Sequence, residues 1–252
     1  MKIFIFCKKE IILISFIFII FTLLFFTFCQ ANSSNNSINF MNKICSHYND
    51  DEKVAFLTFD DGPSPDVTPK ILDILKDEDI KATFFVIGKY VDLHPDIIRR
   101  EYDEGHYIAN HSYNHSNSIL YKSPKNFKDE IIKTDLSIGN AIGAQNYCSH
   151  LFRFPNGFMS NNYKYKKKED VTLLSKLDYF YLDWNCVNND SIKKCSTSQL
   201  LSTLKRTCKN KNIIVVLMHD TKDVNDSSLV LKDSISYLKS QGYIFGNLKD
   251  IM

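Results

Sequence analysis

Short apolar runs alternate with helix-like segments along most of this 252-residue chain. The runs are rich in β-branched and aromatic residues, which favours buried strands, and the segments between them have helical spacing or helix-start and helix-stop residues. Near-continuous apolar strands separated by helices predict an α/β fold with a parallel sheet covered on both faces. Seven such units predict a closed or nearly closed (β/α) barrel, with an open doubly wound sheet as the alternative. We expect strands at 54–59, 82–88, 106–111, 150–155, 179–184, 212–220 and 243–248, and helices at 68–80, 94–105, 123–143, around 164–170, 196–208 and 227–242.

The amino terminus has a different composition from the rest of the chain. The segment Ile11–Cys29 carries no charged residue and follows three lysines. It is long enough to just cross a bilayer, at about 1.5 Å per residue, and small residues at Cys29 and Ala31 also fit a secretory signal. We expect residues 1–31 to be a cleaved signal peptide or an uncleaved membrane anchor, with lipidation of Cys29 as a third option. The leading basic residues predict that the remainder is extracytoplasmic, either secreted or anchored to the membrane.

The region after Ala31 is polar and rich in Asn and Ser, which predicts a flexible tether. We assign residues 32–50 to this linker and residues 51–252 to one folded domain. The net charge is +2, and we expect the only dense basic run, Lys164–Asp170, on a solvated helix face. A nucleic-acid partner is not expected, because such binding requires a clustered basic surface.

Five cysteines follow the apolar segment and its polar continuation. Their number is odd and no CxxC motif occurs, so the spacings do not suggest a thiolate zinc site. Export would permit disulfides, but the sequence alone does not pair them. Cys186 with Cys195 is a local candidate. The five are Cys45, Cys148, Cys186, Cys195 and Cys208.

Polar and charged side chains lie where the predicted strands end. The stretch "LTFDDGP" ends a strand with two adjacent carboxylates, Asp60 and Asp61, which repel each other and require a positive neighbour. In barrels and open α/β sheets, functional sites form beyond the carboxyl ends of the strands. Five strand ends therefore bring chemically competent residues to one rim: Asp60 and Asp61, His111, Arg153 with Pro155, Asp183 with Trp184, and His219 with Asp220.

The stretch "NHSYNH" places His111 and His115 four residues apart. On a helical turn this spacing puts both side chains on one face, where they can hold one metal ion. The pair alone is a weak signal, because two packed or surface histidines are an equally common explanation. With a strand-end aspartate it becomes a catalytic zinc set that leaves a position open for water. Since neighbouring residues on a strand point in opposite directions, one of Asp60 and Asp61 can bind metal while the other acts as a base.

Other residues of the rim suggest proton transfer and orientation. A protonated His219 could donate a proton to a leaving group. Asp183 could hold that imidazole and raise its pKa, and Arg153 could hold Asp60 in place and keep it ionised. Trp184, the only tryptophan, could form the wall of a sugar site or fill the core, and the core is the commoner place for it.

Five motifs, in order along the chain, resemble those of the polysaccharide deacetylases of carbohydrate esterase family four, which share the chitooligosaccharide-deacetylase homology domain. "TFDDGP" and "HSYNH" resemble the first and second motifs, "RFPNG" the third, "LDW" the fourth and "LMHD" the fifth. The third departs from the common pattern at Phe154 and Asn156 but keeps its arginine and proline. The resemblance runs from about Val54 to Leu248 and implies a distorted (β/α) barrel with fewer than eight units.

The resemblance also implies a role for each rim residue. Asp60 would be the general base, and His219 would be the general acid, oriented by Asp183. Arg153 would position the base. The usual metal is zinc, with cobalt or other divalent ions also accepted. The metal ligands would be Asp61, His111 and His115, and the substrate would be contacted by Pro155, Trp184 and Leu217.

We therefore expect residues 51–252 to be the catalytic domain of a metal-dependent hydrolase that removes N-acetyl groups from a cell-wall or surface glycan. Peptidoglycan N-acetylglucosamine is the favoured substrate, and acetate is released. Chitin oligomers, exopolysaccharide and O-acetylated xylan are alternatives, and so is a non-catalytic glycan-binding protein on the same fold. We expect a monomer. A zinc nucleobase deaminase is excluded because its H-x-E and P-C-x-x-C motifs are absent.

Overall fold

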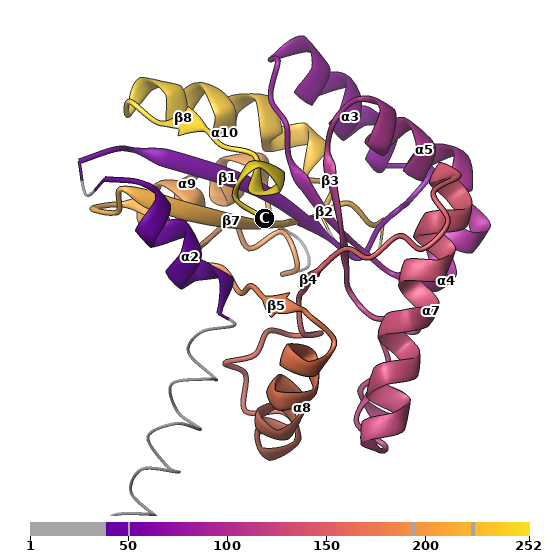
Figure 1. Ribbon diagram of the computed structural model, residues 1–252. Coiled ribbons are helices and arrows are strands. Elements are labelled where there is room, and N and C mark those ends of the chain that lie inside the picture. Colours follow the sequence, from indigo (N-terminus) through magenta and orange to yellow (C-terminus); the bar gives the residue numbers. More distant parts are fainter. Residues whose placement is uncertain (1–38, 50, 193–194, 223–224) are drawn as a thin grey trace, which may run out of the picture.

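The strands form one parallel sheet in the order β5-β4-β3-β2-β1-β7-β6, and β8 pairs with the beginning of β1 (Figure 1). A computed structural model describes residues 39–49, 51–192, 195–222 and 225–252. The predicted signal peptide or anchor at 1–31 lies outside the described residues. The strands are β1 (Val54–Asp60), β2 (Thr83–Val86), β3 (Tyr107–Asn110), β4 (Leu151–Phe152), β5 (Phe180–Tyr181), β6 (Cys186–Val187), β7 (Ile213–His219) and β8 (Ile244–Phe245).

The twisted sheet curls into a half-barrel that stays open between β5 and β6, which do not pair with each other in the described part of the chain. The predicted parallel α/β barrel of about seven strands is thereby confirmed. The strand predicted at 179–184 is confirmed only as the short β5, after which the chain crosses to an unpredicted strand, β6, at the opposite edge. Asn185 begins the new pairing with its side chain, whose Nδ2 donates to the Ile213 carbonyl at 2.9 Å and whose Oδ1 accepts from the Val215 amide at 2.9 Å.

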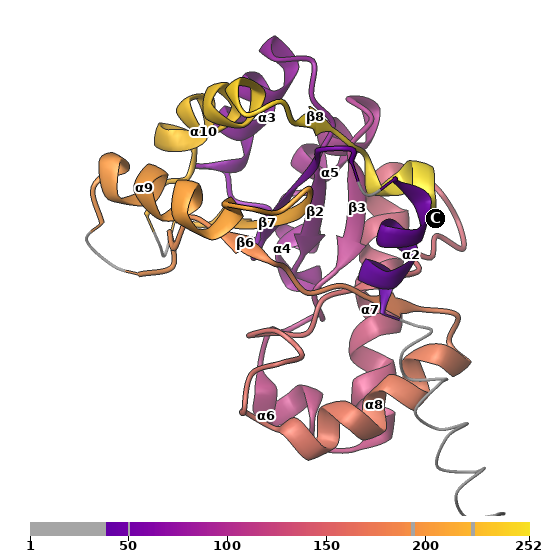
Figure 2. The same ribbon diagram turned by 90° about the vertical axis from the view of Figure 1, so that its left-hand side faces the viewer.

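Helices follow most strands and pack around the sheet (Figures 1 and 2). Their ends follow the local sequence: Ser123 caps α7 by accepting from the Asn126 amide, and Gly143 ends it in a left-handed conformation (φ 68°). Ser196 and Gln199 form a capping box at the start of α9. The helices are α2 (Phe40–His47), α3 (Thr68–Asp77), α4 (Gly88–Leu93), α5 (Pro95–Asp103), α6 (Asn117–Leu120), α7 (Pro124–Ile142), α8 (Lys164–Lys176), α9 (Thr197–Cys208), α10 (Ser228–Ser240) and the 3₁₀ helix η1 (Leu248–Ile251).

The central strand β1 is buried on both faces over its whole length. Its side chains alternate between two apolar clusters, as expected for a strand covered on both sides. One cluster joins the sheet to α3, α5, α9 and α10, and the other fills the inner, concave side. Asp60 ends the strand in the register of the inner side. The outer cluster takes Ala55, Leu57 and Phe59 of β1, and the inner cluster takes Val54 and Phe56.

The helix α2 corrects the predicted linker, because residues 40–47 belong to the folded body. Phe40 and Ile44 are fully buried in the inner cluster, one helical turn apart. Asn39 caps the helix by accepting from the Met41 amide and pairs with Tyr181 at the edge of the sheet. The prediction of a linker followed the Asn- and Ser-rich composition of this region and overlooked the two buried apolar residues.

The five cysteines are all free thiols. The predicted Cys186–Cys195 bridge is therefore not formed. The Cys186 thiol faces α9 instead, 3.2 Å from Thr207 Oγ1. Among the described helices, none combines the length and apolarity that a membrane crossing requires.

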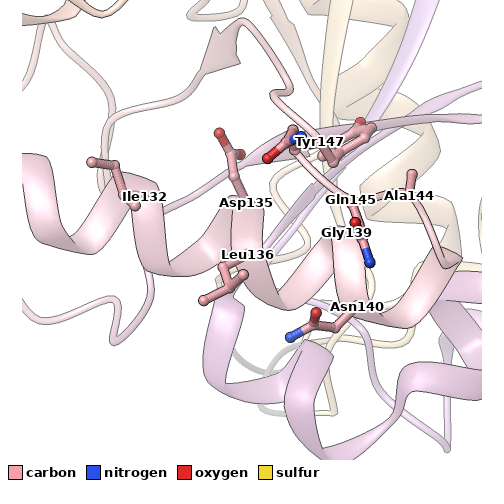
Figure 3. Close-up of a pocket in the computed structure, with 9 residues that line it drawn as sticks. Ile132, Asp135, Leu136, Gly139, Asn140, Ala144, Gln145 and Tyr147 are labelled. Carbon is pink, nitrogen blue, oxygen red and sulfur yellow. The ribbon is translucent and has the colours of Figure 1, made fainter.

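A third, smaller apolar cluster joins α6, α7 and α8 to β4 and β5, and Figure 2 shows these three helices together in the lower part of the view. On another side of α7, a cavity of about 450 Å³ lies between that helix and the segment 144–147 (Figure 3). Ile132 and Leu136 form part of its apolar wall. None of the rim residues predicted from the sequence lines this cavity, so it does not bear on the candidate site.

Candidate active site

Asp60, the last residue of β1, meets Arg153 at the carboxyl edge of the sheet. Asp60 is 3% exposed, and Arg153, which directly follows β4, is fully buried. The guanidinium Nη1 lies 2.7 Å from Asp60 Oδ1 and 2.8 Å from Thr58 Oγ1, and its Nε donates to the Leu182 carbonyl at 2.9 Å. The guanidinium also lies over the ring of Phe85, 3.9 Å from its centroid. The predicted contact between Arg153 and Asp60 is thus present as a buried, hydrogen-bonded ion pair.

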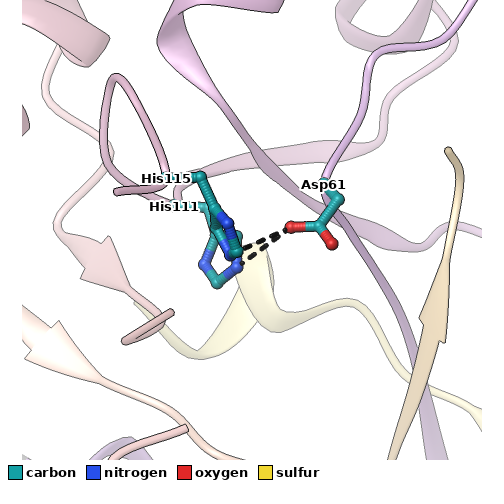
Figure 4. A group of neighbouring side chains, drawn as sticks. All are labelled: Asp61, His111 and His115. Atoms are coloured by element: carbon teal, nitrogen blue, oxygen red, sulfur yellow. Dashed lines mark ion pairs between the residues drawn. The ribbon is translucent and has the colours of Figure 1, made fainter. Parts of the chain in front are cut away.

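Asp61, His111 and His115 converge from two loops (Figure 4). Asp61 Oδ1 lies 3.4 Å from His111 Nε2 and 3.3 Å from His115 Nε2. That oxygen is buried, and no described residue gives it a hydrogen bond of normal geometry. One carboxylate oxygen and two imidazole nitrogens are the donor set of a catalytic zinc site, so these residues fit a divalent cation.

The protonation states of the cluster follow from its contacts. His111 Nδ1 lies 2.8 Å from the Arg153 carbonyl, so Nδ1–H donates there and Nε2 faces Asp61. Although burial opposes it, the charges of Asp60 and Asp61 raise the pKa of His111 while no cation is bound. Burial and the charge of His111 lower the pKa of His115 to about 4, which leaves that ring neutral at pH 7. Although burial opposes it, the contact with His111 and the charges of the nearby histidines hold the pKa of Asp61 well below its usual range.

The two histidines reach the cluster from a loop, so the predicted helical turn is wrong. Ser112 and His115 have left-handed backbone conformations (φ 67° and 53°), and the two imidazole rings lie 4.9 Å apart. The predicted alternation of the aspartates is also wrong, because Asp61 is left-handed (φ 75°) and turns back towards the side of Asp60. His111 Nε2 consequently lies 3.9 Å from Asp60 Oδ2 as well. The turn after β1 keeps both carboxylates at the same site.

His219 ends β7 as the register partner of Asp60, and Asp190 holds its imidazole. Asp190 Oδ1 lies 2.7 Å from His219 Nδ1, and Oδ2 accepts from the His219 backbone amide at 2.7 Å. The predicted contact of Asp183 with His219 is wrong: Asp183 accepts from the amides of Phe158 and Met159 at 2.9 and 3.1 Å. Asp190 follows the unpredicted strand β6, so the strand predicted at 179–184 gave no reason to place it at the rim.

Replacing Asp190 by asparagine is expected to lower the pKa of His219 by about 1 unit or more, because an opposite charge at this distance favours the imidazolium. In the wild type, burial lowers this pKa, but the hydrogen bond and charge of Asp190, with Asp60 and Asp61, raise it to about 9. The raised pKa means that the protonated His219, paired with Asp190, stabilises the folded state. This contribution to the free energy of unfolding is complete below the ordinary histidine pKa of about 6.5 and is lost as the pH rises through about 9.

NMR titration of the His219 ring in the metal-free protein measures this shift. Asp178→Asn is the matched control, since Asp178 lies 3.4 Å from an exposed histidine, His150. Asp190→Asn should also lower the free energy of unfolding more at pH 6 than at pH 10. An unchanged midpoint for His219 would contradict the assignment of Asp190.

Of the predicted substrate-contacting residues, Trp184 lies beside the Asp60–Arg153 ion pair. Trp184 packs against Gly157 so closely that an added Cβ would lie 2.8 Å from the indole, and its ring centroid is 5.7 Å from the Arg153 guanidinium. Pro155 is buried, three positions after the end of β4. Leu217 precedes His219 by two positions on the same side of β7.

Two cavities flank Asp61. One, of about 320 Å³, extends along Pro63, Tyr90 and Thr221, and the other, of about 140 Å³, extends towards Lys89 and His115. Asp61 lines both cavities and His115 lines the smaller one, so the candidate cation site is open to a ligand. A cleft beside convergent polar groups is the usual setting of a small-molecule or polymer site.

Comparison with known proteins places this geometry in one family. A family model described as polysaccharide deacetylase matches residues 47–173. The chain is 32% identical over 207 residues to the peptidoglycan-N-acetylmuramic acid deacetylase PdaA of Bacillus subtilis, covering 81% of this chain and 73% of the relative. It is 36% identical over 136 residues to a peptidoglycan-N-acetylglucosamine deacetylase of Bacillus cereus, covering 54% of this chain and about half, 48%, of the relative.

Solved structures give the same picture of the fold. The catalytic domain of peptidoglycan N-acetylglucosamine deacetylase from Eubacterium rectale is similar with a TM-score of 0.71 and 30% identity, covering 79% of this chain and 90% of that chain. A CE4 family pseudoenzyme from Bacillus anthracis is also similar, with a TM-score of 0.66 and 27% identity, covering 81% of this chain and 66% of that chain. With the family model spanning half of its residues and the rim motifs gathered at one site, this chain belongs to the polysaccharide deacetylase family.

Proposed function

We propose that this protein hydrolyses the N-acetyl group of N-acetylglucosamine in peptidoglycan, in a metal-dependent reaction that releases acetate. The observation that carries the proposal is the convergence of the Asp61–His111–His115 cluster with the Asp60–Arg153 pair. The N-acetylglucosamine deacetylases among the similar proteins support this sugar. The substrate also agrees with the export predicted for the amino-terminal segment.

Asp61, His111 and His115 would hold zinc or another divalent ion, which supplies Lewis-acid polarisation of the acetyl carbonyl and of water. Asp60 would take the proton of the attacking water on Oδ2, because its other oxygen is held by Arg153 at 2.7 Å.

His219 would give its Nε2 proton to the leaving nitrogen, since Nδ1 is held by Asp190 at 2.7 Å. The hydroxyl of the water joins the acetyl carbon as the C–N bond breaks. The products are acetate and a glucosamine residue.

Chelation is expected to lower acetate release at least about 100-fold, because a catalytic metal ion contributes several kcal/mol to the stabilisation of the transition state. The measurement is acetate release by the purified chain from peptidoglycan, chitin oligomers and acetyl-xylan, before and after treatment with a chelator and after adding zinc or cobalt. Full activity of the metal-stripped protein would contradict metal dependence. Absence of acetate from every substrate would instead favour the non-catalytic glycan-binding alternative.

N-Acetylmuramic acid is the second candidate substrate, because the Bacillus subtilis relative is a muramic acid deacetylase. Mass spectrometry of muropeptides after treatment with the protein separates the two sugars, since each loses one acetyl group at a different residue of the glycan. Loss confined to the muramic acid would replace our substrate assignment without changing the proposed chemistry.

A further inference from the structure

The loop between the two candidate histidine ligands is held by side chains at consecutive backbone amides. Gly88 and Lys89 also donate their amides to the carbonyls of Ser112 and Tyr113, at 3.1 and 3.0 Å, so both polar edges of the loop are paired. The loop amides donate as follows: Ser112 to Asn110 Oδ1 (3.0 Å), Tyr113 to Glu130 Oε2 (3.1 Å), Asn114 to Glu130 Oε2 (2.8 Å) and His115 to Ser112 Oγ (3.1 Å).

Glu130 is the member of this set that comes from outside the loop region. It lies within α7, away from both helix ends, and is 6% exposed. Both of its oxygens are used, because Oε1 accepts from Asn114 Nδ2 at 2.7 Å while Oε2 accepts the two amides. In the described part of the chain it makes no ion pair, so N–H groups of the loop are what balance its buried charge.

The loop needs such support because its conformation is not the one its residues prefer. Ser112 and His115 are both left-handed, which costs conformational energy for residues that carry a Cβ. His111, the first ligand, is fixed separately through its amide, which donates to the Val86 carbonyl at 3.0 Å, and through its ring. The position of His115 therefore depends on the segment that Glu130 holds.

We infer that Glu130 is a positioning residue, whose carboxylate sets the His111–His115 loop in its ligand-holding shape before any cation binds. The inference rests on the proposed cation site. Outer partners that orient a ligand affect how tightly the metal is held, although they do not touch it. Glu130 acts here through the backbone of the loop and not through an imidazole.

Glu130→Ala is expected to weaken zinc binding about 10- to 100-fold, measured by competition with a chromogenic chelator. Glu130→Gln is expected to weaken it less, because its amide keeps one accepting oxygen but places an NH₂ group against N–H donors. Asp129→Asn is the matched control, since Asp129 is the neighbouring acid of α7, 54% exposed and, among the described residues, paired only with Lys125. It should bind zinc as the wild type does.

Hydrogen exchange of the metal-free protein provides a second measurement that does not depend on a cation. The amides of Tyr113 and Asn114 should exchange faster in both Glu130 variants than in the wild type and in Asp129→Asn. If Glu130→Ala does not fold, Glu130→Gln and its exchange rates carry the test.

Two results would overturn the inference: unchanged exchange at Tyr113 and Asn114, or faster exchange in a folded variant that binds zinc as tightly as the wild type. The second result would make Glu130 merely structural. A wild-type protein that fails to bind zinc would contradict the proposed cation site instead, and exchange would still show whether Glu130 sets the loop.

Discussion

Asp60→Asn is expected to lower kcat for acetate release about 100- to 10,000-fold, which is the usual contribution of a general base. Asparagine has nearly the same shape, but its amide cannot take the proton from the attacking water. Zinc binding should persist, because Asp61, His111 and His115 supply the candidate ligands. The variant therefore separates the step that moves a proton from the step that binds the cation.

Two quantities are measured: kcat for acetate release from one substrate by the zinc-loaded protein, and the affinity of the protein for zinc. Asp66→Asn is the control, since Asp66 is an exposed acid in the loop that follows Asp60 and Asp61. It should have the kcat of the wild type. Acetate release by Asp60→Asn at the wild-type rate would remove Asp60 from the mechanism, and loss of zinc from this variant would mean that Asp60 is a ligand.

Arg153→Met is expected to lower the free energy of unfolding by about 3–5 kcal/mol, because it leaves the buried Asp60 carboxylate without its cation. The side chain of Arg153 is 0% exposed and that of Asp60 only 4%, so bulk water does little to solvate the remaining charge. Adding Asp60→Asn to this variant should recover part of the loss, since a neutral amide costs less to bury than a charge. Urea unfolding of the metal-free wild type, Arg153→Met and the double variant measures both differences.

Arg100→Met is the matched control for burial. Arg100 also contacts two carboxylates, Glu104 at 2.9 Å and Asp73 at 2.6 Å, but its side chain is 33% exposed. Solvent screening limits such a pair to about 0–1 kcal/mol. Equal losses for Arg100→Met and Arg153→Met would show that burial does not amplify the Asp60–Arg153 interaction.

Most of the fold could be predicted from the sequence because its strands are long apolar runs and its helices carry local start and stop residues. Ser123, Pro124 and Gly143 bound α7 where these signals place it. The failures are at short or polar segments. A two-residue strand such as β6 has no periodicity to detect, and α2 depends on two buried apolar residues inside a polar stretch.

The candidate site divides in the same way. Asp60, Asp61, His111, Arg153 and His219 could be placed at one rim, because each ends or follows a predicted strand and parallel strands bring those ends together. Asp190 could not, because it follows a strand whose pairing is decided by its contact with β7. Asp183 instead accepts hydrogen bonds from backbone amides, and no residue pattern predicts such contacts.

By itself, the sequence determined which chemical groups this protein has and at which end of the sheet they gather, since apolar strands that alternate with helices run parallel. Tertiary structure alone decided that Asp190, and not Asp183, holds His219, and that Glu130 holds the loop between His111 and His115. Left-handed turns at Asp61, Ser112 and His115 and the remote acids Glu130 and Asp190 set those pairings. They depend on backbone conformations and on contacts between segments far apart in the chain, where local propensity carries no information.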